Sequence, residues 1–303
     1  MEIKLLSKLS FSEFLITFSL DEKAKLRSSL FPGAEIRGSL MLRSKHMFCA
    51  NKQYFDNCEL CPLRYKCQYA LLFETPLPKK STVMTRYDEI PHPFTMAVLH
   101  NKGTITTRFV LFGDYIGYFP YLYISLLETM KNKNASLIDA TNFGKHILEG
   151  ENIITEYSRK TANDMFYDYA NPFGVSIDFI SPMRIKYRNK LVNQTNFEFH
   201  HLIRNLLRRF SLLSYFYGGE KLDLDYNAII KQAETVRLSD KDLNWLELER
   251  HSLRTNESTL LGGIVGNVVF DKGASDFMQI LRLGHYIQVG KNTSFGHGYY
   301  ELK

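Results

Sequence analysis

The chain has 303 residues, of which 45% are hydrophobic and 23% charged, so it can bury a full core as one large or two ordinary folded domains. Its formal charge of +6 at pH 7 is only mildly basic, which permits an anionic partner without requiring one. The start, MEIKLLSKLSFSEFL, does not read as a signal peptide, and no stretch has the roughly 18 uncharged apolar residues of a membrane span, so we expect a cytoplasmic protein.

The first half of the chain predicts the element order β-α-β-β-α-β. The elements are a strand at 13–20, a helix at 32–48, strands at 95–100 and 104–112, a helix at 114–130 and a strand near 147–157. The tripeptide Asn101-Lys102-Gly103 suits the short connection between the two middle strands. This order is that of a ferredoxin-like domain.

The second half repeats the same order after a polar, aromatic stretch at 158–173 that includes a turn at Asn171-Pro172. Its predicted elements are a strand at 174–181, a helix at 197–217, strands at 245–253 and 259–270, a helix at 275–283 and a strand at 295–302. The sequence therefore predicts an α+β fold of two tandem ferredoxin-like domains, residues 1–160 and 161–303.

All the cysteines lie in one short insertion of the first domain, residues 49–75. They are Cys49, Cys58, Cys61 and Cys67, with the spacing C-x8-C-x2-C-x5-C. A reducing cytosol disfavours disulfides, whereas a C-x2-C pair lets two thiolates bind one ion and the other two complete a tetrahedron. We expect a structural zinc site, with an iron–sulfur cluster or unligated thiols as the alternatives.

A glycine-rich segment at 284–298 lies between the last predicted helix and the last strand. Its glycines flank the sequence KNTS. Glycine lets the backbone approach another backbone or a phosphate closely, and free N–H groups, a lysine and hydroxyls bind anionic oxygens. The spacing is neither that of a Walker loop nor G-x-G-x-x-G. Two interpretations remain open from the residues alone, a tight turn that packs the sheet and a contact with an RNA backbone.

The segment GKNTSFGHGYYEL resembles the C-terminal signature of the CRISPR-associated endoribonucleases of the RAMP superfamily, the Cas-six type that cuts precursor guide RNA. Other stretches resemble the same family: FPGAEIRGSL at 31–40, CELCPLRYKCQYALLFET at 58–75, FISPMRIK at 179–186, LLRRFSLL at 206–213 and LLGGIVGN at 260–267. Many members of the family lack the cysteines.

The resemblance implies two ferredoxin-like domains that bind CRISPR repeat RNA and cleave precursor crRNA without a metal, leaving 2′,3′-cyclic phosphate and 5′-hydroxyl ends. The alternative is a non-catalytic RAMP subunit that binds crRNA in a CRISPR effector complex. We expect a monomer or a homodimer.

The RNA contacts that the resemblance implies lie in the second domain. They are Arg184, Lys186, Arg208 and Arg209, together with Gly290, Lys291, Asn292, Thr293, Ser294, Gly296 and Gly298 of the glycine-rich segment. For the four basic residues, an ordinary solvated helix or strand face is the alternative.

Metal-free cleavage needs a base for the ribose 2′-hydroxyl, an acid for the leaving 5′-oxygen and a cation for the charge on the phosphorane. The family commonly places a histidine at or just after the first helix, where this chain has His46, with Lys52 as the partner we name. The negative end of that helix favours a protonated imidazole, which suits an acid. His251 and His297 are rival candidates.

Two further histidine positions are not expected to act. His200 and His201 are adjacent on a predicted helix, where neighbouring side chains point in different directions, so we expect them to be poor joint ligands. His92, between two prolines, is expected to be a loop residue.

Overall fold

The computed structural model describes residues 5–24, 26, 31–77, 90–150, 152–165, 174–252 and 257–303, with the main chain alone at 250–252 and 257. The chain divides into two compact units, Phe11–Arg159 and Lys160–Lys303 together with Met1–Ser10. The predicted turn at 171–172 lies outside the described residues.

The start of the chain belongs to the second unit, although the sequence assigned it to the first domain. The main-chain N–H of Leu5 donates to Gln279 Oε1 over 2.6 Å, and Gln279 Nε2 donates back to the Leu5 carbonyl over 2.9 Å. Ser7 Oγ lies 3.0 Å from Ser214 Oγ. These buried bonds to distant positions explain why local sequence patterns did not reveal the assignment.

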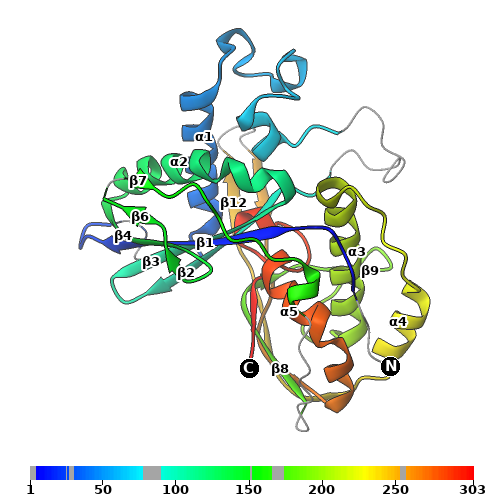
Figure 1. Cartoon of the computed structure of the whole chain (residues 1–303). Coiled ribbons are helices and arrows are strands. Elements are labelled where there is room, and N and C mark those ends of the chain that lie inside the picture. Colours follow the sequence, from blue (N-terminus) through cyan, green and yellow to red (C-terminus); the bar gives the residue numbers. More distant parts are fainter. Residues whose placement is uncertain are drawn as a thin grey trace. The chain divides into compact units, whose positions relative to one another are not determined.

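The unit Phe11–Arg159 has the predicted β-α-β-β-α-β order (Figure 1). Its main elements are β1 (Phe11–Leu20), α1 (Gly33–Phe48), β2 (Phe94–Asn101), β3 (Thr104–Phe112), α2 (Phe119–Lys131) and β4 (Ala135–Asn142). The sheet order is β2-β3-β1-β4, extended at its edge by the short β5 (Lys145–His146), with antiparallel pairing throughout. This is the ferredoxin-like arrangement.

One face of this sheet is covered by α1 and α2 (Figure 1). Alternate residues of β1 are buried, among them Phe14, Ile16 and Phe18, because successive side chains of a strand point to opposite faces. The ring of Phe14 stacks on Phe119 at the start of α2, with 3.7 Å between centroids. The core of the unit therefore lies between the sheet and the two helices.

The predicted strand near 147–157 is wrong. The fourth strand is β4, which follows α2 almost directly, and only the short strands β6 (Leu148–Glu149) and β7 (Asn152–Ile153) lie in the predicted range. In β4, Leu137 and Ile138 are both exposed, so the strand lacks the alternation that identifies a half-buried strand.

The second unit repeats the arrangement. Its main elements are β8 (Val175–Met183), α3 (Phe199–Gly218), α4 (Tyr226–Ala233), β11 (Leu238–Leu246), β14 (Gly263–Phe270), α5 (Met278–Ile287) and β15 (Tyr300–Leu302). The antiparallel sheet has the order β11-β14-β8-β15, the same permutation as in the first unit. The prediction of two tandem ferredoxin-like domains is confirmed.

Details of this unit differ from the sequence prediction. The edge strand β11 spans 238–246 rather than the predicted 245–253. The sequence pattern did not reveal it because most of its side chains are exposed and polar. The chain then forms a separate hairpin of β12 (Glu249–Ser252) and β13 (Glu257–Leu260). The sequence did not predict α4, whose N-terminus is capped by Asp225 accepting from the Ala228 N–H over 2.9 Å.

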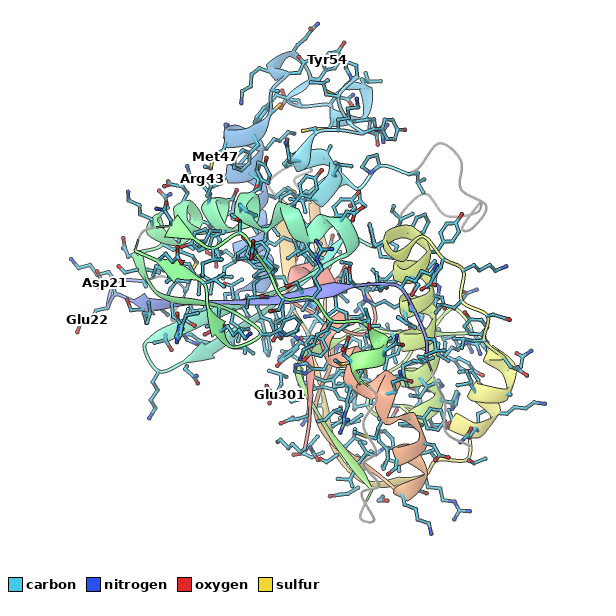
Figure 2. All side chains as sticks on the ribbon, viewed as in Figure 1. Asp21, Glu22, Arg43, Met47, Tyr54 and Glu301 are labelled. Atoms are coloured by element: carbon cyan, nitrogen blue, oxygen red, sulfur yellow. The ribbon has the colours of Figure 1, made fainter. Side chains whose placement is uncertain are left out.

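The insertion between α1 and β2 begins with irregular turns. It contains η2 (Lys52–Tyr54), η3 (Cys58–Leu60) and a π-helical turn, η4 (Ala70–Glu74). No side chain from Cys49 to Gln68 is buried. Figure 2 shows Tyr54 far out in this segment, beyond Arg43 and Met47 on α1. The first part of the insertion therefore has no apolar core of its own.

None of the helices in the described parts of the chain combines the length and the apolar character needed to cross a membrane.

Candidate functional site

His46 lies in the last turn of α1 with an exposed side chain. Its ring centroid is 4.9 Å from that of Phe55. Over the same Phe55 ring lie Lys45 Nζ, 4.8 Å from the centroid, and Lys52 Nζ, 5.3 Å from it. We call Lys45, His46, Lys52 and Phe55 the Phe55 cluster. It brings one imidazole and two ammonium groups together on one aromatic ring.

The ammonium group of Lys52 is tied to the end of the helix. Its Nζ donates a hydrogen bond to the main-chain oxygen of His46 over 2.9 Å. The last carbonyls of a helix have no intrahelical partner and carry a partial negative charge, so a lysine there stabilises the helix end. The structure thus brings together the two residues that the sequence paired, and it adds Lys45.

The four cysteines all have half-buried, unpaired thiols. Burial raises the pKa of the Cys58 thiol, Lys45 opposes this, and Cys49 and Cys67 raise it further. The Cys61 N–H donates to the Cys58 carbonyl over 3.2 Å, which folds the C-x2-C pair into one turn. No three of the four sulfur atoms, all of them in the described range, lie within 4.8 Å of one another.

The glycine-rich segment is shorter than predicted, because α5 continues to Ile287 and includes Gly284. A Cβ atom at Gly284 would lie 2.0 Å from Tyr300 Oη, and one at Gly298 would lie 1.9 Å from the Val289 carbonyl oxygen. These glycines permit close packing within the unit.

Most of the polar and glycine positions of this segment are not at the surface. Thr293, Ser294, Gly296 and Gly298 are buried, and Gly290 and Asn292 are half-buried. Lys291 is exposed, and its N–H donates to the Arg184 carbonyl over 2.9 Å. Among these residues, Lys291 is the one whose side chain is exposed rather than buried or half-buried.

The predicted basic contacts fall into two groups. Lys186 and Arg208 are exposed, whereas Arg184 Nη1 donates to the Gly262 carbonyl over 2.7 Å. Arg209 Nε donates to the Ile287 carbonyl, its Nη2 atom is buried, and burial lowers the Arg209 pKa to about 10. Arg184 and Arg209 therefore support the fold around β8, α3 and α5.

The rival histidine His297 is buried, with 3% of its surface exposed. Burial lowers its pKa to about 4, although main-chain contacts with Phe295 and Leu261 act in the opposite direction. It is therefore neutral at physiological pH, which does not suit an acid. His251 lies in β12, and its side chain is outside the described residues.

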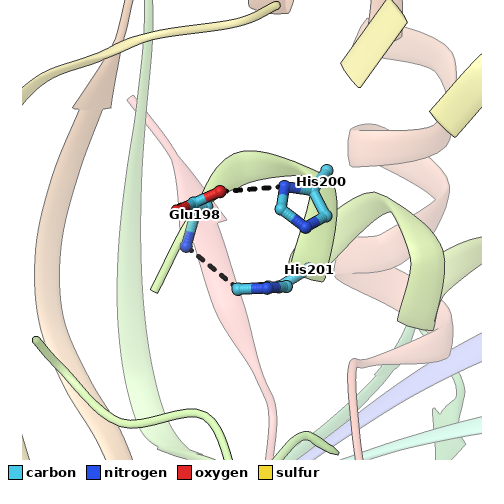
Figure 3. A group of neighbouring side chains, drawn as sticks. All are labelled: Glu198, His200 and His201. Carbon is cyan, nitrogen blue, oxygen red and sulfur yellow. Dashed lines mark hydrogen bonds and ion pairs between the residues drawn. The ribbon is translucent and has the colours of Figure 1, made fainter. Parts of the chain in front are cut away.

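The two histidine side chains do not point apart, as the sequence had led us to expect. Glu198, His200 and His201 bring their ligating atoms within 4.8 Å of one another (Figure 3). The Glu198 carboxylate lies 3.2 Å from His200 Nδ1, and the Glu198 N–H donates to His201 Nδ1 over 3.2 Å. Because α3 begins at Phe199, both histidines lie in its first turn. There the N-cap residue Glu198 contacts His200 through its carboxylate and His201 through its main-chain N–H.

The spacing Glu198-x-x-His201 is a capping-box pattern, and this is the feature by which the sequence could have located the group. The ring of Tyr187 covers the pair, with its centroid 5.2 Å from His200 and 4.6 Å from His201. Burial, followed by the neighbouring His200, lowers the His201 pKa to about 4.

His92 also has more contacts than a loop position suggests. Its Nε2 lies 3.3 Å from Arg37 Nη2, and its Nδ1 lies 2.5 Å from Thr75 Oγ1. Arg37 is buried in α1. The sequence missed this arrangement because the three residues are far apart along the chain.

Residues 177–300 match the family model described as CRISPR-associated endoribonuclease Cas6. This span runs from β8 to the first residue of β15, and so includes part of every strand of the main sheet of the second unit. Residues 177–300 are therefore a Cas6-type segment. The resemblance that the segment GKNTSFGHGYYEL indicated is confirmed. Residues 9–144 match a second family model, AF_1859_N, described as an N-terminal domain.

Similarity to known proteins covers both units, in sequence to one relative and in fold to solved structures. A protein of Archaeoglobus fulgidus, described as an uncharacterized protein, is 24% identical over 261 residues, covering 82% of this chain and 83% of its own. Thermus thermophilus Cas6 has a TM-score of 0.56 at 12% identity, covering 99% of this chain and 100% of that one. A partial Cas6-RT-Cas1–Cas2 complex has a TM-score of 0.59 at 14% identity, covering 99% of this chain and 47% of that one.

Proposed function

We propose that this protein is an endoribonuclease that binds CRISPR repeat RNA and cleaves precursor crRNA into guide units. The match of residues 177–300 to the Cas6 endoribonuclease family carries the proposal. The Phe55 cluster supports it, because an imidazole can transfer protons and ammonium groups can stabilise the charge that develops on the phosphorane.

The reaction we assign needs no metal ion. The 2′-oxygen of the ribose attacks the adjacent phosphorus, a 2′-O–P bond forms and the P–5′-O bond breaks. The 2′-hydroxyl proton goes to a base, and the departing 5′-oxygen takes a proton from an acid. The products are a 2′,3′-cyclic phosphate and a 5′-hydroxyl, with no net change in redox state.

His46 is the residue we assign to proton transfer, because imidazole changes its protonation state near neutral pH and this ring is exposed. Lys52 supplies positive charge for the phosphorane, and Lys45, over the same Phe55 ring, adds to it. The hydrogen bond from Lys52 Nζ to the His46 carbonyl keeps that charge at the end of α1.

RNA binding outside the Phe55 cluster is assigned to the second unit. Lys186, Arg208 and Lys291 are exposed and can meet phosphates, whereas the buried glycines set the path of the backbone beneath Lys291. Arg184 and Arg209 would act by supporting that surface. The partners we propose are repeat RNA, the crRNA product and other Cas proteins, and the compartment is the cytoplasm.

The test is cleavage of a repeat-containing transcript in the presence of EDTA by the wild-type chain, His46→Ala and the control His146→Ala. His146 is an exposed histidine in β5 of the same unit. Wild type and His146→Ala should produce cyclic phosphate ends, and His46→Ala should lose activity. No cleavage by the wild type would favour a non-catalytic RAMP subunit that binds crRNA, and active His46→Ala would overturn the site assignment alone.

We also propose a structural zinc ion bound by Cys49, Cys58, Cys61 and Cys67. Twenty consecutive residues without a buried side chain need another source of order, and small segments commonly obtain it from a metal. The single turn that joins Cys58 and Cys61 supports the proposal, as does the electrostatic influence of Cys49 and Cys67 on Cys58. Since no three sulfurs lie within 4.8 Å of one another, the turns must close around the ion.

A further inference from the structure

A short, strongly basic hairpin follows β8 in the second unit. Its strands are β9 (Lys186–Tyr187) and β10 (Lys190–Leu191), paired in antiparallel fashion, with Arg188 and Asn189 as the turn. Lys186, Arg188 and Lys190 are all exposed. The function proposed above uses Lys186 alone of these residues.

The turn of this hairpin holds an arginine in an unfavourable backbone conformation. Arg188 has φ +48° and Asn189 has φ +64°, so both residues occupy the left-handed region. Two-residue hairpin turns of this kind favour asparagine and glycine, and another residue there costs about 1 kcal/mol. Asn189 fits this preference, but Arg188 does not. A strained residue at the tip of an exposed turn suggests a role for its side chain in binding.

Two guanidinium groups make cation–π contacts with the ring of Tyr187. Arg188 Cζ lies 5.1 Å from the Tyr187 centroid, and Arg204 Cζ, from α3, lies 5.8 Å from it. Cation–π contacts of this kind hold an arginine in place while its N–H groups stay available. Arg208 lies one helical turn beyond Arg204, and both are exposed. We call Lys186, Arg188, Lys190, Arg204 and Arg208 the hairpin patch.

Four of the five basic residues of this patch have no acidic side chain paired with them in the described part of the chain. Among the residues that the structure describes, none forms an ion pair with Lys186, Arg188, Lys190 or Arg204. The nearby Glu198 carboxylate is directed to His200 Nδ1, 3.2 Å away. Like charges held together without carboxylates create a field that attracts a polyanion.

The same field argues against a cation at the Glu198, His200 and His201 group. The ring of Tyr187 contacts both histidines and also the guanidinium groups of Arg188 and Arg204. Two positive charges therefore lie close to the histidine pair. Moreover, His201 Nδ1 already accepts the Glu198 N–H. The chemistry of this region therefore suits phosphate rather than a divalent metal.

We propose that the hairpin patch binds the phosphate backbone of the RNA, with Arg188 and Arg204 contacting phosphates and Tyr187 positioning both guanidinium groups. This site rests on the proposed function and extends it, because Arg188, Lys190, Arg204 and Tyr187 are added to the RNA contacts. Planar guanidinium groups can each donate two N–H bonds to one phosphate.

The experiment measures binding of a repeat RNA that carries a 2′-deoxy nucleotide at the cleavage position, so that affinity is read without cleavage. Arg188→Gly should leave the melting temperature unchanged or raise it, since glycine relieves the turn. It should weaken RNA binding about tenfold, the scale of one charge-assisted hydrogen bond. The slope of log affinity against log salt should fall by about one.

Arg204→Gln should show the same loss, whereas Lys231→Gln, at an exposed lysine of α4, serves as the matched control. Wild-type affinity and salt slope in both arginine variants would overturn the patch while leaving the proposed function intact. Failure of the wild-type chain to bind the RNA would overturn the proposed function itself. Loss of binding in EDTA together with loss in His200→Ala would instead indicate a metal at Glu198, His200 and His201, and would also overturn the patch.

Discussion

Lys52 Nζ donates a hydrogen bond to the main-chain oxygen of His46 over 2.9 Å, so one side chain both closes the end of α1 and brings a positive charge to the proposed reaction site. The same Nζ lies over the ring of Phe55, next to Lys45 and His46. Lys52 therefore contributes both to the stability of the helix end and to the charge at the site.

Replacing Lys52 tests the contribution of its charge to the reaction. Lys52→Ala should lower the single-turnover cleavage rate by about 10- to 100-fold, because charge stabilisation of the phosphorane is lost. Lys52→Arg should recover part of the rate, since arginine retains both the charge and the donor. RNA affinity should change much less than the rate. Lys145→Ala, at an exposed lysine of β5, is the control, and an equal loss of rate in both alanine variants would contradict the assignment.

Gly298 is expected to be far less replaceable than Gly219. Both have positive φ, +72° and +69°, but a Cβ at Gly298 would lie 1.9 Å from the Val289 oxygen while Gly219 has nothing within 4 Å. Gly219→Ala should cost about 1 kcal/mol from its backbone conformation alone. Gly298→Ala should cost clearly more in thermal or urea unfolding. Equal stability losses would show that the segment relaxes around the added methyl group.

The second unit should lose stability as the pH falls. The pKa of His201 and that of His297 are each lowered to about 4, chiefly by burial, whereas an unfolded histidine titrates near 6.5. Between these values the unfolded chain binds more protons than the folded one, so the free energy of unfolding decreases from about pH 6.5 towards pH 4. The loss can reach roughly 3 kcal/mol per histidine.

Urea unfolding at a series of pH values measures this loss. His297→Gln should reduce the dependence on pH, because the buried imidazole that resists protonation is removed. If His297→Gln does not fold, the imidazole resonances of the wild-type protein report the two titrations directly. Titration of both residues near 6.5 would contradict the prediction.

Removal of metal should affect the cysteine insertion first. The purified protein is expected to contain about one zinc per chain by elemental analysis, and Cys61→Ser should reduce that content. A strong chelator should make residues 49–68 sensitive to proteolysis while β1 to β4 stay protected, because that stretch contributes no buried side chain. Metal-free protein with a protease-resistant insertion would contradict the zinc proposal.

The sequence predicted elements well where burial alternates or follows a helical stripe. The strand β1 and the helix α3 are examples, since Phe14, Ile16 and Phe18 alternate and Ile203, Leu206 and Phe210 share a face. Prediction was poor for the strands β4 and β11, whose exposed residues hide the pattern. A strand that is stabilised mainly by pairing with its neighbours need not show alternating hydrophobic and polar residues.

The candidate site was predictable to a similar extent. His46 and Lys52 are close in sequence and at the end of a helix, so their proximity could be expected. The contact between Tyr187 and the histidine pair could not, because it depends on the hairpin returning to the start of α3. The tight packing that explains Gly284 likewise depends on Tyr300 in another element.

The hydrogen bonds of Leu5 with Gln279 determine an order of events during synthesis. The residues of the Phe11–Arg159 unit are all made before most of the second unit exists, whereas the start of the chain has to remain unattached until α5 has been synthesised. At ribosomal speeds of about 5–20 residues per second, the 274 positions that separate Leu5 from Gln279 take roughly 14 to 55 seconds to synthesise. Residues 5–10 therefore form their final contacts only after most of the chain has been synthesised.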